Sequence, residues 1–168
     1  ANPNKVLMVS EIPAKENDTG DEHAAGVVVR SLDRMGMSLF YASRTCGWMK
    51  KEPPKHLEFD LEGRFRCPMS RFDIEPFLRA HRDFGLVVIM SRVWDFPVVR
   101  GLPDDWIPHI RTLMPEATVV VWGVDVHAMC RPDAHYRRPA PQQMFGQMFS
   151  QLVALDAADG VVAYTPDE

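Results

Sequence analysis

Short apolar runs alternate with longer amphipathic segments along this chain. The runs are rich in Val, Ile, Leu, Met and Ala with little polar alternation, which is typical of strands covered on both faces and therefore of a parallel sheet. The predicted strands are Val6–Ser10, Ser38–Ser43, Leu86–Ser91, Thr118–Gly123 and Val161–Thr165. The pattern thus predicts a sheet whose strands are separated by segments long enough to be helices.

Amphipathic periodicity predicts a helix in most of the gaps between the strands. The predicted helices are His23–Met35, Phe72–Phe84, Asp104–Met114 and Gln142–Ala158. Gly36 follows the first as a C-terminal glycine, and Ser70 is a candidate cap for the second, where Pro76 must lie in the first turn to be tolerated. The last helix carries an apolar stripe that we assign to core packing, made of Met144, Met148, Leu152 and Leu155.

This alternation predicts an α/β fold, Rossmann-like and doubly wound, with a mostly parallel sheet and helices on both faces. With 168 residues, 46% of them hydrophobic, a single domain over residues 1–168 is expected. The segment Thr45–Arg71 is less regular, and there we predict a loop with one strand, His56–Leu61, at the sheet edge.

Charge and cysteine usage exclude several classes of function. A net charge of −4 argues against a nucleic-acid binder, which needs basic clusters to displace counterions. The three cysteines, Cys46, Cys67 and Cys130, are too far apart for a disulfide framework or a sulfur-rich zinc site, so we expect a cytoplasmic protein. Because no apolar run approaches ~20 residues, we expect no transmembrane segment, while peripheral contact with a membrane is left open.

The loop Glu11–Asp21 is the first candidate for chemistry. A glycine where a first strand meets a helix lets the backbone approach a ligand, and the free N–H groups of the helix start favour a phosphate. Gly20 holds that position, but acidic neighbours such as Asp18 and Glu22 would repel phosphate unless they point away. The alternative is a solvated loop whose acids complement the helix dipole.

A second candidate is the pair Asp125 and His127, directly after the predicted strand Thr118–Gly123. Residues two apart on an extended chain point the same way, and an acid beside an imidazole raises the imidazole pKa and fixes its tautomer, which suits general-base work on a hydroxyl. Two alternatives stay open. In the first, His127 is a structural histidine and Asp125 caps the next turn. In the second, the pair binds a metal ion together with His135.

The third candidate is the exit of the strand Leu86–Ser91. Arg92 could pair with a phosphate or carboxylate, and Trp94 could stack on a sugar ring or a base. The alternative is that Trp94 and Phe96 simply cover the next helix.

Taken in order, several segments are similar to one known family. They are Lys5–Ser10 with the following Gly20 loop, Val29–Gly36, Asp83–Ile89, Pro115–His127 and Leu155–Glu168. Across nearly its whole length the chain resembles the N-terminal Rossmann-like domain of a GT-B glycosyltransferase of family 4, also called group 1. The last two segments are the most specific.

The resemblance implies an acceptor-side domain that forms a cleft with a second, donor-binding domain and transfers a sugar from a nucleotide-sugar donor to a glycosyl acceptor, without a cofactor. Gly20 and Thr19 would approach the donor phosphate or sugar, His127 with Asp125 would act at the transferred sugar, and Arg92 with Trp94 would meet the acceptor. The chain departs from the family where relatives often have a glycine pair in the first loop, and at Gln151, where they often have glutamate.

The sequence contains nothing similar to the donor-binding half, and it ends at Glu168, where a further helix would begin. We therefore expect a truncated domain that does not transfer sugar alone, because proximity and charge stabilisation need both walls of the cleft. A non-catalytic Rossmann-like binding module is the main alternative. A phosphoacceptor receiver would need a lysine ending its fifth strand, yet no lysine follows Lys55, and a small hydrolase lacks a nucleophile motif.

Overall fold

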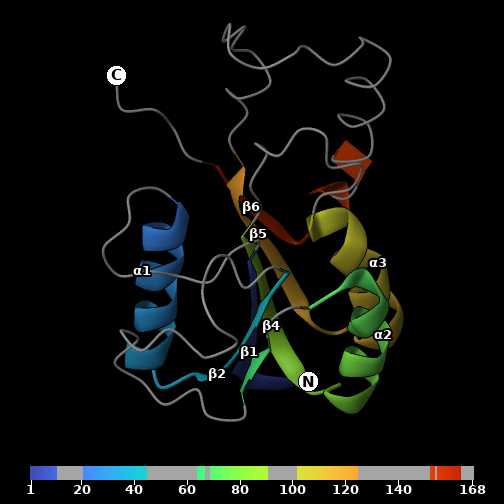
Figure 1. The fold of residues 1–168 in the computed structure, drawn as a ribbon, viewed down its shortest axis with the longest axis horizontal. Helices are drawn as coiled ribbons and strands as arrows, with labels where there is room; N and C mark the ends of the chain where they lie inside the picture. Colours follow the sequence, from blue (N-terminus) through green and yellow to red (C-terminus); the bar gives the residue numbers. More distant parts are fainter. Residues whose placement is uncertain are drawn as a thin grey trace, which may run out of the picture.

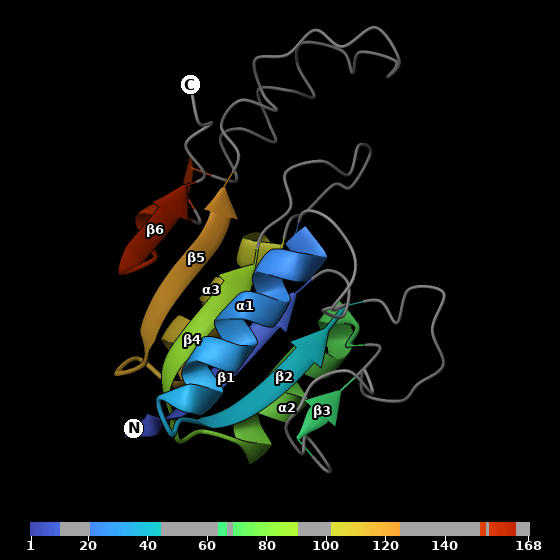
Figure 2. The ribbon, with the colours of Figure 1, turned by 90° about the vertical axis from the view of Figure 1, so that its left-hand side faces the viewer.

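The computed structural model describes residues 1–10, 21–44, 64–66, 69–90, 102–124, 152–153 and 155–163. Their centre is a six-stranded sheet in the order β3-β2-β1-β4-β5-β6, in which every neighbouring pair is parallel (Figure 2). The strands are β1 (Asn2–Ser10), β2 (Ser38–Ser43), β3 (Phe65–Arg66), β4 (Phe84–Met90), β5 (Thr118–Val124) and β6 (Gly160–Ala163). The predicted parallel α/β fold is confirmed.

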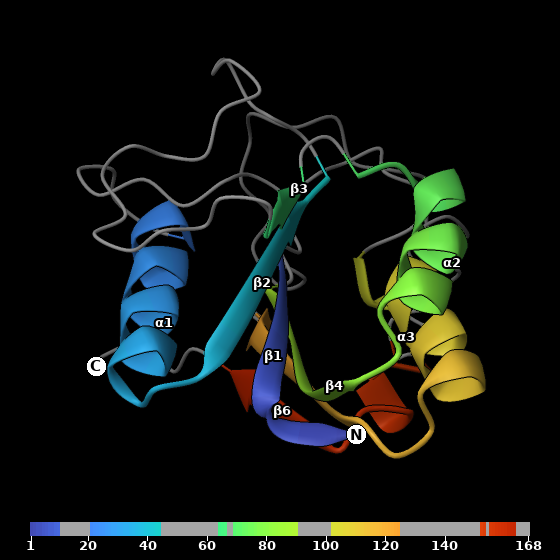
Figure 3. The same cartoon turned by 90° about the horizontal axis from the view of Figure 1, so that it is seen from below.

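Helices cover both faces of this sheet. Helix α1 (Asp21–Arg34) lies on one face, whereas α2 (Arg71–Ala80) and α3 (Leu102–Leu113) lie on the other (Figures 1 and 3). The chain passes from β1 outward to β2 and later returns to β4 on the other side of β1. This reversal is the topological switch point of a doubly wound sheet, and it lies between β1 and β4.

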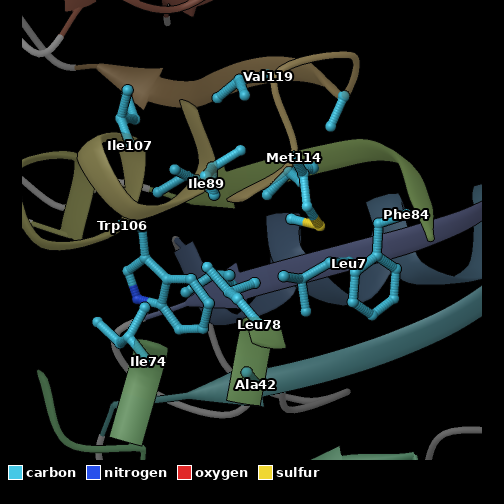
Figure 4. Close-up of a cluster of buried hydrophobic side chains, with 14 of the residues drawn as sticks. Leu7, Ala42, Ile74, Leu78, Phe84, Ile89, Trp106, Ile107, Met114 and Val119 are labelled. Carbon is cyan, nitrogen blue, oxygen red and sulfur yellow. The ribbon is translucent and has the colours of Figure 1, made fainter. Parts of the chain in front are cut away.

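Each face of the sheet has its own apolar core, which explains why the strands lack polar alternation. Successive residues of β1 point to opposite faces, and all of Val6–Val9 are at most 1% exposed. Leu7 and Val9 join the larger core under α2 and α3, around the buried Trp106 (Figure 4). Val6 and Met8 join the second core, under α1. A strand buried on both faces must be apolar at every position.

The end of α1 follows the sequence prediction. Gly36 has a φ of 73°, and its N–H donates to the Asp33 carbonyl at 2.8 Å while Met37 N–H donates to the Leu32 carbonyl at 3.0 Å. This pair of bonds is the Schellman arrangement, which needs a residue in the left-handed region and therefore favours glycine.

Helix α2 begins as predicted but ends earlier. The Ser70 N–H donates to Asp73 Oδ2 at 3.1 Å, which caps the first turn. The prediction that Pro76 lies in that turn is wrong, because it is the sixth residue of the helix. Burial of Ile74, Phe77 and Leu78 on one side offsets the hydrogen bond that the proline removes.

The predicted boundary at Phe84 is also wrong, since this residue opens β4. The Asp83 carbonyl already accepts a hydrogen bond from Asn2 N–H at 2.8 Å, so the chain has joined the sheet by then. β3, at one end of the sheet order, is an edge strand and comprises Phe65–Arg66. The predicted edge strand His56–Leu61 lies outside the described residues.

Only the end of the predicted helix Gln142–Ala158 is described, and 152–153 and 155–156 are helical there. Leu155 packs against the core under α2 and α3, as expected. Leu152 is 60% exposed, so its assignment to the core is wrong for the described part of the molecule. Met144 and Met148 lie outside the described residues.

Candidate functional site

All strands of the sheet are parallel, so their carboxyl ends lie along one side of the sheet. We call this side the carboxyl edge; it runs across the strand ends and is distinct from the edge strands β3 and β6. Ligands of open α/β sheets bind outside this edge, at the switch point, here between β1 and β4. β1 ends at Ser10 and β2 at Ser43, and these two are the buried polar residues among those whose burial is described, at 3% and 0% exposure. Buried polar side chains in an α/β core therefore gather where a ligand site is expected.

Hydrogen bonds join the ends of β1 and β2 at this edge. Ser10 Oγ and the Tyr41 hydroxyl are 2.8 Å apart in a buried position. The Arg44 N–H donates to the Ser10 carbonyl at 3.0 Å, and the Met69 N–H donates to the Ser43 carbonyl at 2.8 Å, which brings the start of α2 to the same edge. The polar groups are thus satisfied in a fixed arrangement, as buried polar groups must be.

An ion pair links the end of β2 to the first turns of α3. An Arg44 guanidinium nitrogen donates to Asp105 Oδ2, and the two side chains are 19% and 9% exposed. Asp105 carries its charge near the N-terminus of a helix, where the macrodipole favours an anion. The carboxyl edge therefore holds a partly buried cation and anion in direct contact.

An open groove of about 590 Å³ lies between the outer sides of α2 and α3. Its lining combines both charges with apolar surface and comprises Arg71, Phe72, Glu75, Pro76, Arg79, Asp104, Asp105, Pro108 and His109. Arg79 donates to Glu75 Oε1 at 2.7 Å and lowers the pKa of that carboxyl, while the Arg71 guanidinium lies 4.7 Å from the ring centre of the exposed Phe72. Glu75 and Arg79 pair with each other, and the lining as a whole carries both positive and negative side chains.

The residues singled out in the sequence follow three of the strands. Thr19 and Gly20 come after β1, Arg92 and Trp94 after β4, and Asp125 and His127 after β5. All six lie outside the described residues, as does His135. β1, β4 and β5 are consecutive neighbours in the sheet and end at the same edge.

The described residues add two negative findings. Within the described ranges, no group of three or more His, Cys, Asp or Glu residues is arranged to hold a metal ion. No helix in the same part of the chain is long and apolar enough to cross a bilayer.

Sequence reasoning missed the polar contacts at the carboxyl edge. Ser10 and Ser43 each end an apolar run, and a hydroxyl at that position is a weak signal that could have been noted. Arg44 and Asp105 are 61 residues apart, and nothing in the sequence pairs them.

No protein-family model matches this chain, and a search of curated proteins found no significant relative. The fold and the candidate site define a Rossmann-like α/β protein with a parallel sheet.

Proposed function

We propose that this chain is the acceptor-side domain of a GT-B glycosyltransferase, which transfers a sugar from a nucleotide-sugar donor to a glycosyl acceptor. One observation supports this beyond the sequence resemblance. The segments with Gly20, Arg92 and His127 start from three strands that end side by side, on both sides of the switch point. An open parallel sheet binds its ligands there.

The proposed chemistry assigns a role to each segment. The backbone around Thr19 and Gly20, just before α1, approaches the donor phosphate, because the N–H groups of a helix start attract anions. His127, held in one tautomer by Asp125, hydrogen-bonds or deprotonates a sugar hydroxyl. Arg92 and Trp94 contact the acceptor by charge and by stacking on a ring.

A second domain completes the site in this proposal. Transfer requires donor and acceptor to be held together and the developing charge to be stabilised, and an open sheet edge provides one wall only. We therefore expect turnover in a protein that joins residues 1–168 to such a donor-binding domain, called the full-length protein below, and not in residues 1–168 alone.

The test incubates the full-length protein with UDP-glucose or GDP-mannose and measures the release of nucleoside diphosphate. Glycans from a cell extract, or water, serve as the acceptor. His127→Ala should lower kcat/KM by roughly 100-fold, the usual contribution of a positioned acid–base group, without changing the melting temperature. His109→Ala, which removes an imidazole from the outer side of α3, is the matched control and should turn over normally.

One result would remove a residue from the proposal, and another would overturn it. Equal turnover by the wild type and His127→Ala would remove the histidine from the mechanism. A wild-type protein that binds these donors but releases no nucleoside diphosphate would favour a non-catalytic Rossmann-like binding module.

A further inference from the structure

Exposed apolar side chains gather beside one edge strand of the sheet. Four of the seven exposed large hydrophobic residues in the described ranges come from the stretch 152–162. They are Leu152 and Val153, in the helical segment that leads into β6, and Val161 and Val162 in β6 itself, and we call them the β6 surface. The other three lie on α1, at its end and on α2. A gathered apolar patch is typical of an interaction site, whereas single exposed residues need no explanation.

β6 lies at one end of the sheet order, and β5 is its one strand neighbour among the described residues (Figure 2). Such a strand presents a row of backbone N–H and C=O groups that its neighbour does not use. Val161 pairs with Val121, which belongs to the core under α2 and α3. Val162 pairs with Trp122, which packs against the core under α1. β6 thus exposes a valine on each face beside its unused backbone groups, and one added strand would cover all of them.

The edge strand at the other end of the sheet order, β3, is different. It comprises only Phe65–Arg66, and the exposed Arg64 and Arg66 place charges on it. Short length and charge are common means by which proteins prevent an edge strand from pairing with another chain. β6 is longer and uncharged, Gly160–Ala163. Of the two edge strands, β6 is therefore the one that can accept a further strand.

A second copy of this chain fits the β6 surface for reasons of symmetry and charge. A two-fold axis brings the same strand of two copies together in antiparallel orientation, so that like residues meet near the axis. A charged strand would repel itself there, whereas β-branched side chains form favourable cross-strand pairs. The charge next to β6 in the chain is on Asp159, and it is held by Arg111 at 2.9 Å and by the Val119 N–H at 2.7 Å. The edge strand is therefore self-complementary.

We propose that two copies of this chain pair antiparallel through β6 and join their sheets into one. Leu152 and Val153 add apolar contact on the face of α2 and α3, where their helical segment lies, since Leu155 packs against the core of that face. The inference goes beyond the proposed function and does not depend on it. Antiparallel pairing points the two carboxyl edges in opposite directions, so neither copy lies across the proposed reaction site of the other.

The experiment measures the mass of the chain of residues 1–168 by analytical ultracentrifugation at concentrations of roughly 5 to 500 μM. Because the paired strands are short, we expect a weak, reversible dimer with a Kd of about 10–100 μM. The β6 amides should exchange hydrogen more slowly at the high concentration than at the low one, because they become hydrogen-bonded across the interface.

Val161→Lys places two positive charges at the interface, one from each copy, and should raise the Kd at least about tenfold. The matched control is Val27→Lys, since this valine on α1 is 44% exposed, compared with 47% for Val161, but lies outside the β6 surface. It should dimerise as the wild type does. Leu152→Lys changes the helical part of the β6 surface at a side chain that is 60% exposed, and it decides the question if Val161→Lys does not fold.

The outcomes are distinct. A chain that stays monomeric up to the highest concentration overturns the inference, and slow exchange of the β6 amides in that monomer would assign the strand to another occupant. A dimer that survives Val161→Lys or, where that variant does not fold, Leu152→Lys, would place the contact elsewhere, as would an equal weakening by Val27→Lys. The readouts are mass and hydrogen exchange, so a protein without turnover would overturn the proposed function and leave the dimer intact.

Discussion

The two edges of the sheet are held together by different kinds of contact. At the amino edge, where the strands begin, several side chains bond to the backbone, alongside the ion pairs Lys5–Asp83 and Arg111–Asp159. Arg111 donates to the Ala157 and Ala117 carbonyls, and Asp159 accepts from the Val119 N–H at 2.7 Å. At the carboxyl edge, side chains bond to one another, as in Ser10–Tyr41 and Arg44–Asp105.

Under the proposed function, this difference leads us to expect a different role for each edge. The amino-edge contacts are partly exposed. Several of them satisfy main-chain N–H and C=O groups that have no partner within a strand or helix, a role that any folded protein needs. At the carboxyl edge, Ser10–Tyr41 is buried and Arg44–Asp105 is partly buried, and both join side chains from different elements, which defines a shape at the cost of desolvation. We therefore expect substitutions at the amino edge to change stability alone, and those at the carboxyl edge to change function as well.

The largest expected loss of stability comes from Gly85→Ala at the amino edge. A Cβ there would lie 2.4 Å from the Asn2 carbonyl oxygen and 2.7 Å from Pro3 Cα, so backbone must move. We expect a loss of about 1–3 kcal/mol in the free energy of unfolding, measured by urea denaturation. Gly160→Ala is the control, because its nearest contact is an ordinary 3.7 Å to a Val120 methyl group. Similar losses in both variants would contradict the steric explanation.

Next in size is Arg111→Met, which removes the hydrogen bonds to Ala157, Ala117 and Asp159. Partial exposure of the guanidinium reduces the effect, and we expect a loss of about 1–2 kcal/mol in urea denaturation. If the proposed function holds, turnover of nucleotide sugars by the full-length protein should not change. A loss of turnover at wild-type stability would contradict the division of roles between the edges.

The contacts of Asp159 predict that the free energy of unfolding depends on pH in the acid range. The Val119 N–H and then Arg111 hold its pKa below the ordinary value of 3.8, so the folded state binds this proton less tightly than the unfolded state. The stabilisation is complete above the unfolded pKa and is lost as the pH falls through the folded pKa. Asp159→Asn should flatten the decline of stability below about pH 4 in acid titrations. An unchanged acid slope would contradict this assignment.

Tyr41→Phe tests the carboxyl edge with a smaller expected loss, about 1 kcal/mol, because one buried hydrogen bond to Ser10 is removed without change of shape. If the proposed function holds, turnover by the full-length protein should fall as well, since the end of β1 loses a hydrogen bond to β2. Normal turnover at the reduced stability would make this contact equivalent to those of the amino edge.

The smallest effect is expected from His81 at the amino edge. Burial and then the charge of Lys5 lower its pKa from 6.5, so its contribution is present above pH 6.5 and declines as the pH falls. His81→Phe keeps an aromatic ring beside Phe77 and Phe40 and should reduce the stability difference between pH 7.5 and pH 5.5. An unaltered difference would assign the pH dependence to other groups.

Much of the fold could be predicted because its signals are local. The run Thr118–Gly123 is apolar at almost every position, and Gly36 marks the end of α1 by its own backbone preference. Pro76 misled the prediction because local propensity disfavours it inside α2, and burial of the helix face overrides that preference. For the candidate site, the sequence alone indicated which residue types follow β1, β4 and β5 and in what order they occur.

Strand alternation and glycine placement thus determined the fold class and the ends of several elements, since both depend on neighbours along the chain. Tertiary structure alone decided which strands are adjacent, that Ser10 meets Tyr41, and that Arg44 reaches Asp105 across 61 positions. These contacts depend on how far-apart segments pack, and the energy of a buried charge or hydroxyl is set by the partner that packing provides.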